Sequence, residues 1–134
     1  MSAFKVSVVA RNPKDEQRTT TPIEALVDTG SELTWLPASL LHAAGIAPRR
    51  KRAFATATQE IVERDVGYAI VAAEGFETND EVVFAEPSDA TLLGVRTIEG
   101  FGVIVDDVGH RFVARTTIVA PTPAALPPAR AARR

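Results

Sequence analysis

Cysteine is absent from the 134 residues. Its absence excludes disulfide bonds and thiolate metal ligands and leaves the redox compartment open. Histidine occurs only at His42 and His110, a spacing that matches no metal-ligand pattern. The sequence also lacks a glycine-rich phosphate loop and a Gly-x-Ser-x-Gly nucleophile motif. We therefore expect no metal and no cofactor, and neither nucleotide-dependent nor serine-hydrolase chemistry.

Long apolar runs are lacking as well. No stretch approaches the length of a membrane span. The first residues, Met1 to Val6, have neither the basic segment nor the apolar run of a signal peptide. We expect a cytoplasmic protein that does not associate with membranes.

Neither sign of charge is in large excess, since 15 Lys and Arg oppose 17 Asp and Glu, for a net charge of −2. This balance gives no general attraction to nucleic acid or to an anionic membrane. The cluster Arg49 to Arg52 is interpreted as a solvated loop that enters a strand; the alternative is a role in favouring acidic substrate side chains or an acidic partner. Because no aromatic residues interleave with these charges, nucleic-acid binding by a small β-barrel ranks lowest among the functions considered.

The most informative stretch that is present runs from Ala25 to Ser31. Three apolar residues lead into Asp28, where an unpaired ionised carboxylate would be costly to bury. Gly30 can adopt backbone angles closed to other residues, and the hydroxyls of Thr29 and Ser31 can donate to a carboxylate or to the backbone. The pattern indicates a carboxylate in a polar turn. An Asp28 that merely caps this turn is the simpler alternative.

Leu26-Val27-Asp28-Thr29-Gly30-Ser31 resembles the signature of the aspartic proteases of the retroviral type, apolar-apolar-Asp-Thr/Ser-Gly-Ala/Ser. A second element, Leu92-Leu93-Gly94, comes later in the chain and precedes Val95 to Phe101 and an apolar stretch. In that family an apolar-apolar-Gly element lies beneath the catalytic loop, opens a short helix and is followed by a strand. The resemblance covers roughly residues 4 to 119.

Alternating and β-branched apolar residues predict an all-β class with closed or packed sheets. The resemblance narrows this to a retropepsin-like closed β-barrel or sandwich with one or two short helices, forming a two-fold dimer. The predicted strands are 4–10, 19–27, 33–36, 54–58, 61–73, 76–85, 102–105 and 111–120, and the predicted short helices are 37–45 and 95–101. Residues 1–120 form the domain, and 121–134, rich in Pro, Ala and Arg, are expected to be a disordered tail.

The resemblance also implies roles for individual residues. Asp28 would be the catalytic acid and base, and Thr29 would hydrogen-bond across to a second copy. Gly30 would donate its backbone N–H to the carboxylate, and Ser31 would add a donor. Leu93 and Gly94 would pack beneath the loop without taking part in the chemistry.

The hairpin at residues 54–73 corresponds to the flap that closes over substrate in that family. Its expected tip is Ala57, Thr58 and Gln59. Flaps of this kind commonly carry glycine at the tip, and none is present here. A plain sheet hairpin with no flap role is the alternative.

One carboxylate cannot be both general base and general acid when water attacks a peptide bond, whereas two carboxyl groups that share one proton can. Asp-Thr-Gly occurs once in the sequence, and Asp65, Asp80, Asp89 and Asp106-Asp107 lack it. The pair would therefore come from Asp28 of two copies in a symmetric homodimer.

The resemblance implies that terminal strands of the two copies interleave, here Phe4–Val9 and Phe112–Val119. The expected function is an aspartic endopeptidase acting on a peptide or protein substrate. The alternative is a non-catalytic peptide-binding or dimerisation module on the same fold.

Overall fold

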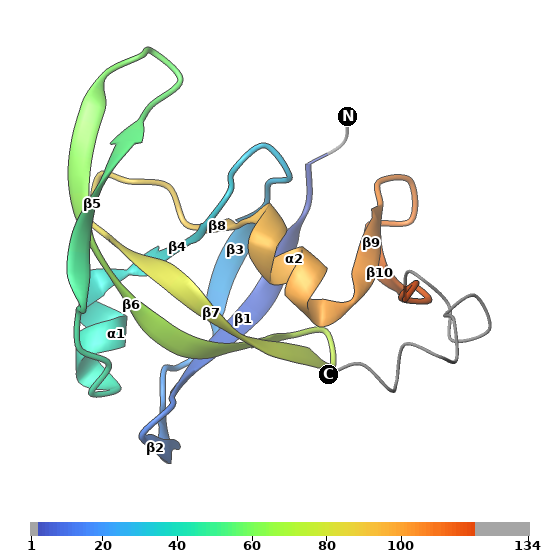
Figure 1. The fold of residues 1–134 in the computed structure, drawn as a ribbon, viewed down its shortest axis with the longest axis horizontal. Helices are drawn as coiled ribbons and strands as arrows, with labels where there is room; N and C mark the ends of the chain where they lie inside the picture. The colour runs from blue at the N-terminus through green and yellow to red at the C-terminus, as the bar shows by residue number, and fades with distance from the viewer. Residues whose placement is uncertain (1–2, 120–134) are drawn as a thin grey trace, which may run out of the picture.

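The structure is a computed structural model and describes residues 3–119. Its elements are β1 (Lys5–Asn12), β2 (Asp15–Thr19), β3 (Ile23–Val27), β4 (Thr34–Pro37), α1 (Ala38–Ala43), β5 (Arg50–Ala55), β6 (Ile61–Ala73), β7 (Phe76–Ala85), β8 (Leu92–Leu93), α2 (Val95–Phe101), β9 (Val103–Asp106) and β10 (Arg111–Ala114). Strands dominate the described residues, so the predicted all-β class with two short helices is confirmed (Figure 1). The expected tail, 121–134, lies outside the described residues.

The main sheet has the order β2-β1-β3-β8-β4-β7-β6-β5, and a further pairing of β1 with β6 closes it. Residues Lys5–Val8 of β1 pair with β3, whereas Val8–Arg11 pair with β6. One long strand thus joins both ends of the ring, and the predicted closed barrel is confirmed. The interior is filled by alternate apolar side chains that are fully buried, among them Val8, Ala25, Leu36, Val71 and Val82.

Residues 19–27 were predicted to form one strand, and this was wrong because the chain breaks at Thr20–Pro22. Pro22 has no N–H to contribute to a ladder. Thr20 is buried and turns back onto β1, where its N–H donates to the Ala10 carbonyl (2.9 Å) and its Oγ1 accepts from the Ala10 N–H (3.1 Å). Only Thr19 of the segment belongs to β2, which forms a hairpin with β1, and Ile23–Val27 form β3 of the barrel.

Two other strand boundaries also differ from the prediction. Strand β5 begins at Arg50, so most of the basic cluster lies in a strand and not in a loop. The last strand ends at Ala114, well before residue 120, because its partner β9 is only 4 residues long. The Arg115 N–H still donates to the Gly102 carbonyl (2.9 Å).

Beside the barrel, β9 and β10 form a separate hairpin next to α2 (Figure 1). Phe112 from this hairpin packs near Phe4, Phe76 and Phe101, which extends the core around the barrel end. Helix α2 ends at Gly102, whose φ of 75° suits glycine. Within residues 3–119, no helix combines the length and apolar character needed to cross a membrane.

Candidate active site

Asp28 lies directly after β3, at the point where that strand leaves the barrel. Parallel pairing of β3 with β8 continues to this residue, because the Asp28 N–H donates to the Leu93 carbonyl (3.0 Å). The chain then turns, with the Ser31 N–H donating to the Asp28 carbonyl (3.1 Å). The Gly30 N–H donates to Asp28 Oδ1 (2.9 Å), as the resemblance implied. Asp28 is therefore tethered at both its backbone and its carboxylate.

Helix α2 supports the Asp28 loop from below. Its first two residues, Val95 and Arg96, donate backbone N–H groups to the carbonyls of Ser31 (2.8 Å) and Glu32 (3.1 Å). These are the free donors of a helix start, used here to bind loop carbonyls. Gly94 is buried against the Leu33 carbonyl, and a side chain there would overlap it. The structural role predicted for Leu93 and Gly94 agrees with this position.

The hydroxyls of the loop point in different directions. Ser31 Oγ donates to the Leu33 carbonyl (2.8 Å), so this group stabilises the loop and does not bind the Asp28 carboxylate. The Thr29 side chain is exposed beside Asp28. Its contact with a second copy therefore stays a prediction.

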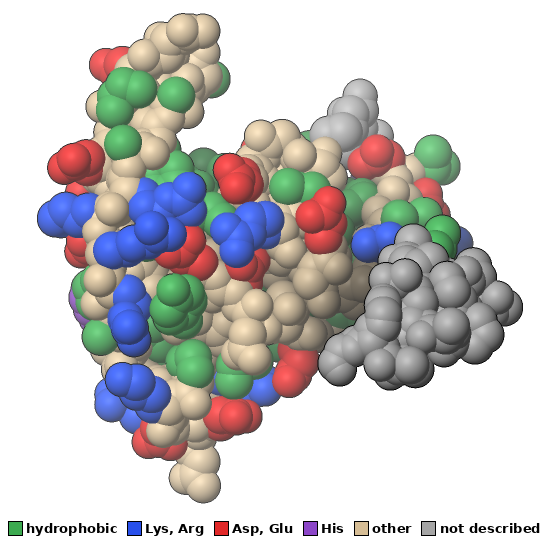
Figure 2. Space-filling view, viewed as in Figure 1, with side chains coloured by type: hydrophobic (Ala, Val, Ile, Leu, Met, Phe, Trp, Pro, Cys, Tyr) green, Lys and Arg blue, Asp and Glu red, His purple; other side chains and the backbone are tan. Residues whose placement is uncertain are grey.

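A groove of about 540 Å³ lies between the Asp28 loop and the β5–β6 hairpin. Figure 2 shows the hairpin projecting beyond the barrel next to this hollow. The groove is lined by Asp28, Gly30, Ser31, Trp35, Ala55, Thr56, Ala57, Val62, Asp89, Ala90 and Leu92. Its wall is mainly apolar, and Asp28 is one of the charged residues that line it. The structure thus brings the predicted catalytic residue and part of the predicted flap into one site.

The hairpin tip is a tight turn over Thr56–Glu60. The Gln59 N–H donates to the Thr56 carbonyl (2.8 Å), and the Thr56 N–H donates to the Glu60 carbonyl (2.8 Å). Gln59 has φ = 69°, in the left-handed region. Loops of this kind pair a type I turn with one left-handed residue, usually glycine. The tip is therefore ordered by hydrogen bonds but has glutamine where glycine is favoured.

Replacing Gln59 with Gly is expected to stabilise this turn by about 0.5–1 kcal/mol, because glycine lacks the Cβ that makes left-handed backbone costly. Protection of the Thr56 amide in hydrogen exchange should rise accordingly. Thr58→Gly is the matched control, since Thr58 is not among the residues with positive φ, and it should lower that protection. Equal effects of the two changes would contradict this account of Gln59.

Asp89 is a charged groove residue that the sequence did not indicate as part of the site. Asp89, in the loop before β8, is held by Arg64 of β6 through Nε–Oδ2 (2.7 Å) and Nη2–Oδ1 (2.9 Å). Its Oδ2 also accepts the Glu86 N–H (2.8 Å). The hydrogen bonds from Arg64 hold the pKa of the Asp89 carboxyl below its usual range, against the opposing effect of burial. Nothing in the local sequence links these residues, which only the barrel brings together.

The Asp89–Arg64 pair should make stability depend on pH in one direction. Since its folded pKa is lowered, Asp89 stabilises the fold above its unfolded pKa of about 3.9, and this contribution is lost as pH falls toward the folded value. We expect wild type to exceed Asp89→Asn in free energy of unfolding at pH 6 and the difference to shrink below about pH 4. Urea unfolding of both proteins at each pH measures this difference in free energy. A difference that stays constant with pH would show that the charge of the Asp89 carboxylate does not contribute to it.

The histidines and Asp106 do not line the groove. Both histidines are exposed, with His110 stacked on Phe4 at 5.1 Å between ring centroids and His42 beside Phe84. Asp106 caps the β9–β10 turn by accepting the N–H groups of Val108 and Gly109. Among the described residues, no cluster of His, Asp and Glu has the arrangement of a metal site.

A carboxylate in an Asp-Thr-Gly turn that lines a mainly apolar groove on a closed barrel defines a candidate acid–base site. The model of the aspartyl protease family matches residues 16–97, which include Asp28 and Gly94. The match spans more than half of the chain, and this protein belongs to the aspartyl protease family. The family predicted from the sequence is thereby confirmed.

Similar solved structures include a retropepsin-like aspartic protease from Rickettsia conorii, with 19% identity, a TM-score of 0.46, and coverage of 78% of this chain and 84% of that one. A foamy viral protease–reverse transcriptase in complex with double-stranded DNA also matches, with 19% identity and a TM-score of 0.48 over 69% of this chain. This chain spans only 14% of that viral protein. No curated protein sequence matches the chain.

Proposed function

We propose that this protein is an aspartic endopeptidase whose active site forms when two copies bring their Asp28 carboxyl groups together. The observation that carries the proposal is the groove, which has the Asp28 loop on one side and flap residues Ala55–Ala57 on the other. An extended peptide placed there would pass directly over the carboxylate. The apolar lining from Trp35, Val62 and Leu92 favours apolar substrate side chains.

The two Asp28 groups would share one proton, because like charges at contact distance raise one pKa and leave the other low. The ionised carboxyl takes a proton from water as the water oxygen bonds to the scissile carbon. The protonated carboxyl gives its proton to the carbonyl oxygen, which forms a neutral diol. Return of that oxygen's proton to the dyad and transfer of a proton to the nitrogen then release the amine. The reaction needs no covalent intermediate.

Exposed apolar side chains near the end of the chain support a homodimer. Ile104, Val108, Val113, Ile118 and Val119 are 37–95% exposed, and all lie in the β9–β10 hairpin or in the segment after it. Such side chains are favourable to bury against a second copy. Of the two terminal segments expected at the interface, 4–9 lies mostly in β1 within the barrel. In the other, Phe112 is buried and residues 113–119 are exposed.

The runner-up function is a peptide-binding module on the same fold. The tip sequence favours it, because Ala57, Thr58 and Gln59 include no glycine, whereas substrate-covering flaps of this kind commonly carry glycine at the tip. A module would bind peptides in the groove and leave them intact. The expected cytoplasmic location stays a prediction under either function.

Dilution tests the proposed function. If two copies supply the site, cleavage of a mixed peptide library between about pH 4 and 7 should fall faster than linearly as the protein is diluted. Sedimentation measured on the same samples should show dimers dissociating over the same concentrations. Cleavage strictly proportional to protein concentration, in samples that contain only monomer, would contradict a shared site. Peptide binding without cleavage by a folded dimer would favour the module.

A further inference from the structure

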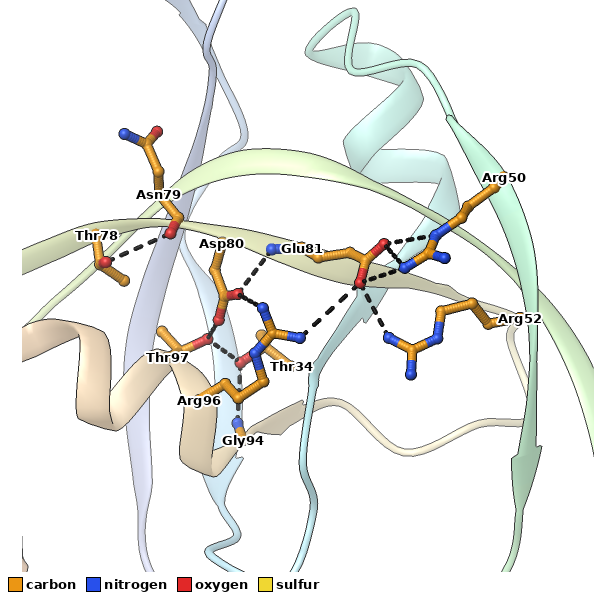
Figure 3. Close-up of polar contacts among 10 residues, drawn as sticks. All are labelled: Thr34, Arg50, Arg52, Thr78, Asn79, Asp80, Glu81, Gly94, Arg96 and Thr97. Carbon is orange, nitrogen blue, oxygen red and sulfur yellow. Dashed lines mark hydrogen bonds and ion pairs between the residues drawn. The ribbon is translucent and has the colours of Figure 1, made fainter.

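A buried polar network connects the β5–β6 hairpin, here called the flap hairpin, to the support of the Asp28 loop (residues 28–33), here called the catalytic loop (Figure 3). At its centre are Asp80 and Glu81, neighbours on β7, whose side chains are each 6% exposed. Burying two carboxylates is costly unless each has good partners. The elements that supply these partners are therefore the elements that Asp80 and Glu81 connect.

Asp80 is linked to the catalytic loop by two threonines. The Gly94 N–H donates to Thr34 Oγ1 (2.9 Å), Thr34 Oγ1 lies 2.6 Å from Thr97 Oγ1, and Thr97 Oγ1 donates to Asp80 Oδ2 (2.9 Å). An N–H can only donate and a carboxylate can only accept, so both hydroxyl protons must point toward Asp80. Because both threonines are fully buried, no water competes for these groups.

The chain of hydrogen bonds ends at the residue on which the Asp28 loop rests. Gly94 lies against the carbonyls of Leu33 and Ser31, and it immediately precedes the two N–H donors of α2 that bind loop carbonyls. Any shift of Gly94 would move these donors. Asp80 is thus connected through two threonine hydroxyls to the residue that supports the Asp28 loop.

Glu81 is linked to the flap. Arg50 donates to its carboxylate through Nε (3.0 Å) and Nη2 (2.9 Å), and Arg52 donates through Nη1 (3.0 Å). Residues two apart on a strand share a face, so β5 presents both arginines to Glu81 together. Among the strands of residues 3–119, β5 lies at the edge of the sheet and pairs with β6 alone. These ion pairs therefore attach the outer strand of the flap to β7.

Arg96 closes the network between the two carboxylates. Its guanidinium lies 3.5 Å from Asp80 Oδ1 and 4.0 Å from Glu81 Oε1. Asp80 Oδ1 also accepts the Glu81 N–H (2.8 Å). A movement of either carboxylate would change the partners of the other.

We propose that Asp80 and Glu81 are positioning residues that keep the flap hairpin and the catalytic loop in register across the groove. Asp80 acts on the loop through Thr97 and Thr34, and Glu81 acts on the flap through Arg50 and Arg52. The proposal rests on the proposed function only in taking the groove as the substrate site. The network itself can be tested without any cleavage.

The first test is hydrogen exchange at the Gly94 amide, followed by NMR in the folded protein. Thr97→Val keeps the shape of the side chain and removes the hydroxyl, so exchange at Gly94 should become about tenfold faster, as loss of one buried hydrogen bond implies. Thr97→Ser restores the hydroxyl and should return exchange to the wild-type rate. Lys51→Gln removes an exposed ion pair with Asp65 on the flap strand and should leave Gly94 unchanged.

The second test separates the two halves by kinetics. Thr97→Val should lower kcat about 10–100-fold with little change in KM, because a displaced catalytic loop impairs the transition state and not substrate binding. Glu81→Gln should mainly raise KM, because a loosened flap binds substrate less well. Combining the two changes should give an effect that differs from the product of the single effects, since they act within one network.

An unchanged Gly94 exchange rate in a folded Thr97→Val protein would overturn the proposal, as would a Thr97→Ser protein that behaves like Thr97→Val. If the effect of the double variant on kcat/KM equals the product of the two single effects, the flap and the loop are not coupled and the proposal is wrong. If exchange changes as expected but the wild type cleaves no peptide, the network is supported and the proposed peptidase function fails.

Discussion

Replacing Asp28 with Asn is expected to lower kcat for peptide hydrolysis by at least about 10³-fold, because general acid–base catalysis is lost in both copies at once. An amide cannot take a proton from water at any pH in the working range. The substitution preserves shape, and its amide oxygen can still accept the Gly30 N–H that Asp28 Oδ1 accepts at 2.9 Å. The fold and the dimer should therefore remain.

Asp15→Asn is the matched control, since Asp15 is an exposed residue of β2 outside the groove and its loss should not change cleavage. Circular dichroism and sedimentation should show Asp28→Asn folded and dimeric. Cleavage that persists in the variant would show that Asp28 is not the catalytic group. A variant that no longer folds or dimerises would mean that Asp28 has a structural role, as the turn-capping alternative holds.

The Asp28 loop and its support could be predicted because the information is local. Each lies in a short stretch whose residue types are constrained together: an apolar strand, a carboxylate and a glycine at Asp28–Gly30, and two leucines before Gly94. The barrel brings these stretches together through the pairing of β3 with β8. The family pattern implied that the Leu92-Leu93-Gly94 element lies beneath the Asp28 loop, but not the strand pairing that places it there.

The polar network beneath the site could not be predicted in this way. Arg50 and Arg52 belong to a run of basic residues that is typical of a solvated loop, and nothing nearby indicates a buried acid. Glu81 is 31 residues from Arg50 in the chain. The two meet because β5 and β7 flank β6, a topological fact. The same holds for Arg64 and Asp89, 25 residues apart.

Replacing Gly94 with Ala is expected to lower both the stability of the fold and the activity. Its φ of −91° and ψ of 172° are open to any residue, so the requirement for glycine is one of space and not of backbone freedom. A Cβ here would lie 2.5 Å from the Leu33 carbonyl carbon, closer still to its oxygen, and 3.0 Å from the Ser31 carbonyl oxygen. Because these are backbone atoms, they cannot move aside without shifting the Asp28 loop. We expect a loss of about 3 kcal/mol in the free energy of unfolding.

Activity should fall further than the loss of stability explains. At temperatures where Gly94→Ala is still folded, we expect kcat to be about 100-fold lower, because a shift of about 1 Å in a catalytic group has effects of that size.

Gly102→Ala is the control that separates crowding by an added Cβ from backbone strain. Gly102 has φ = 75° but nothing within 4 Å of an added Cβ, so this change should cost about 1 kcal/mol and spare kcat. If Gly94→Ala unfolds no more easily than Gly102→Ala and cleaves normally, the loop does not depend on close packing against residue 94. If it is destabilised yet fully active when folded, Gly94 serves the barrel and not the position of Asp28.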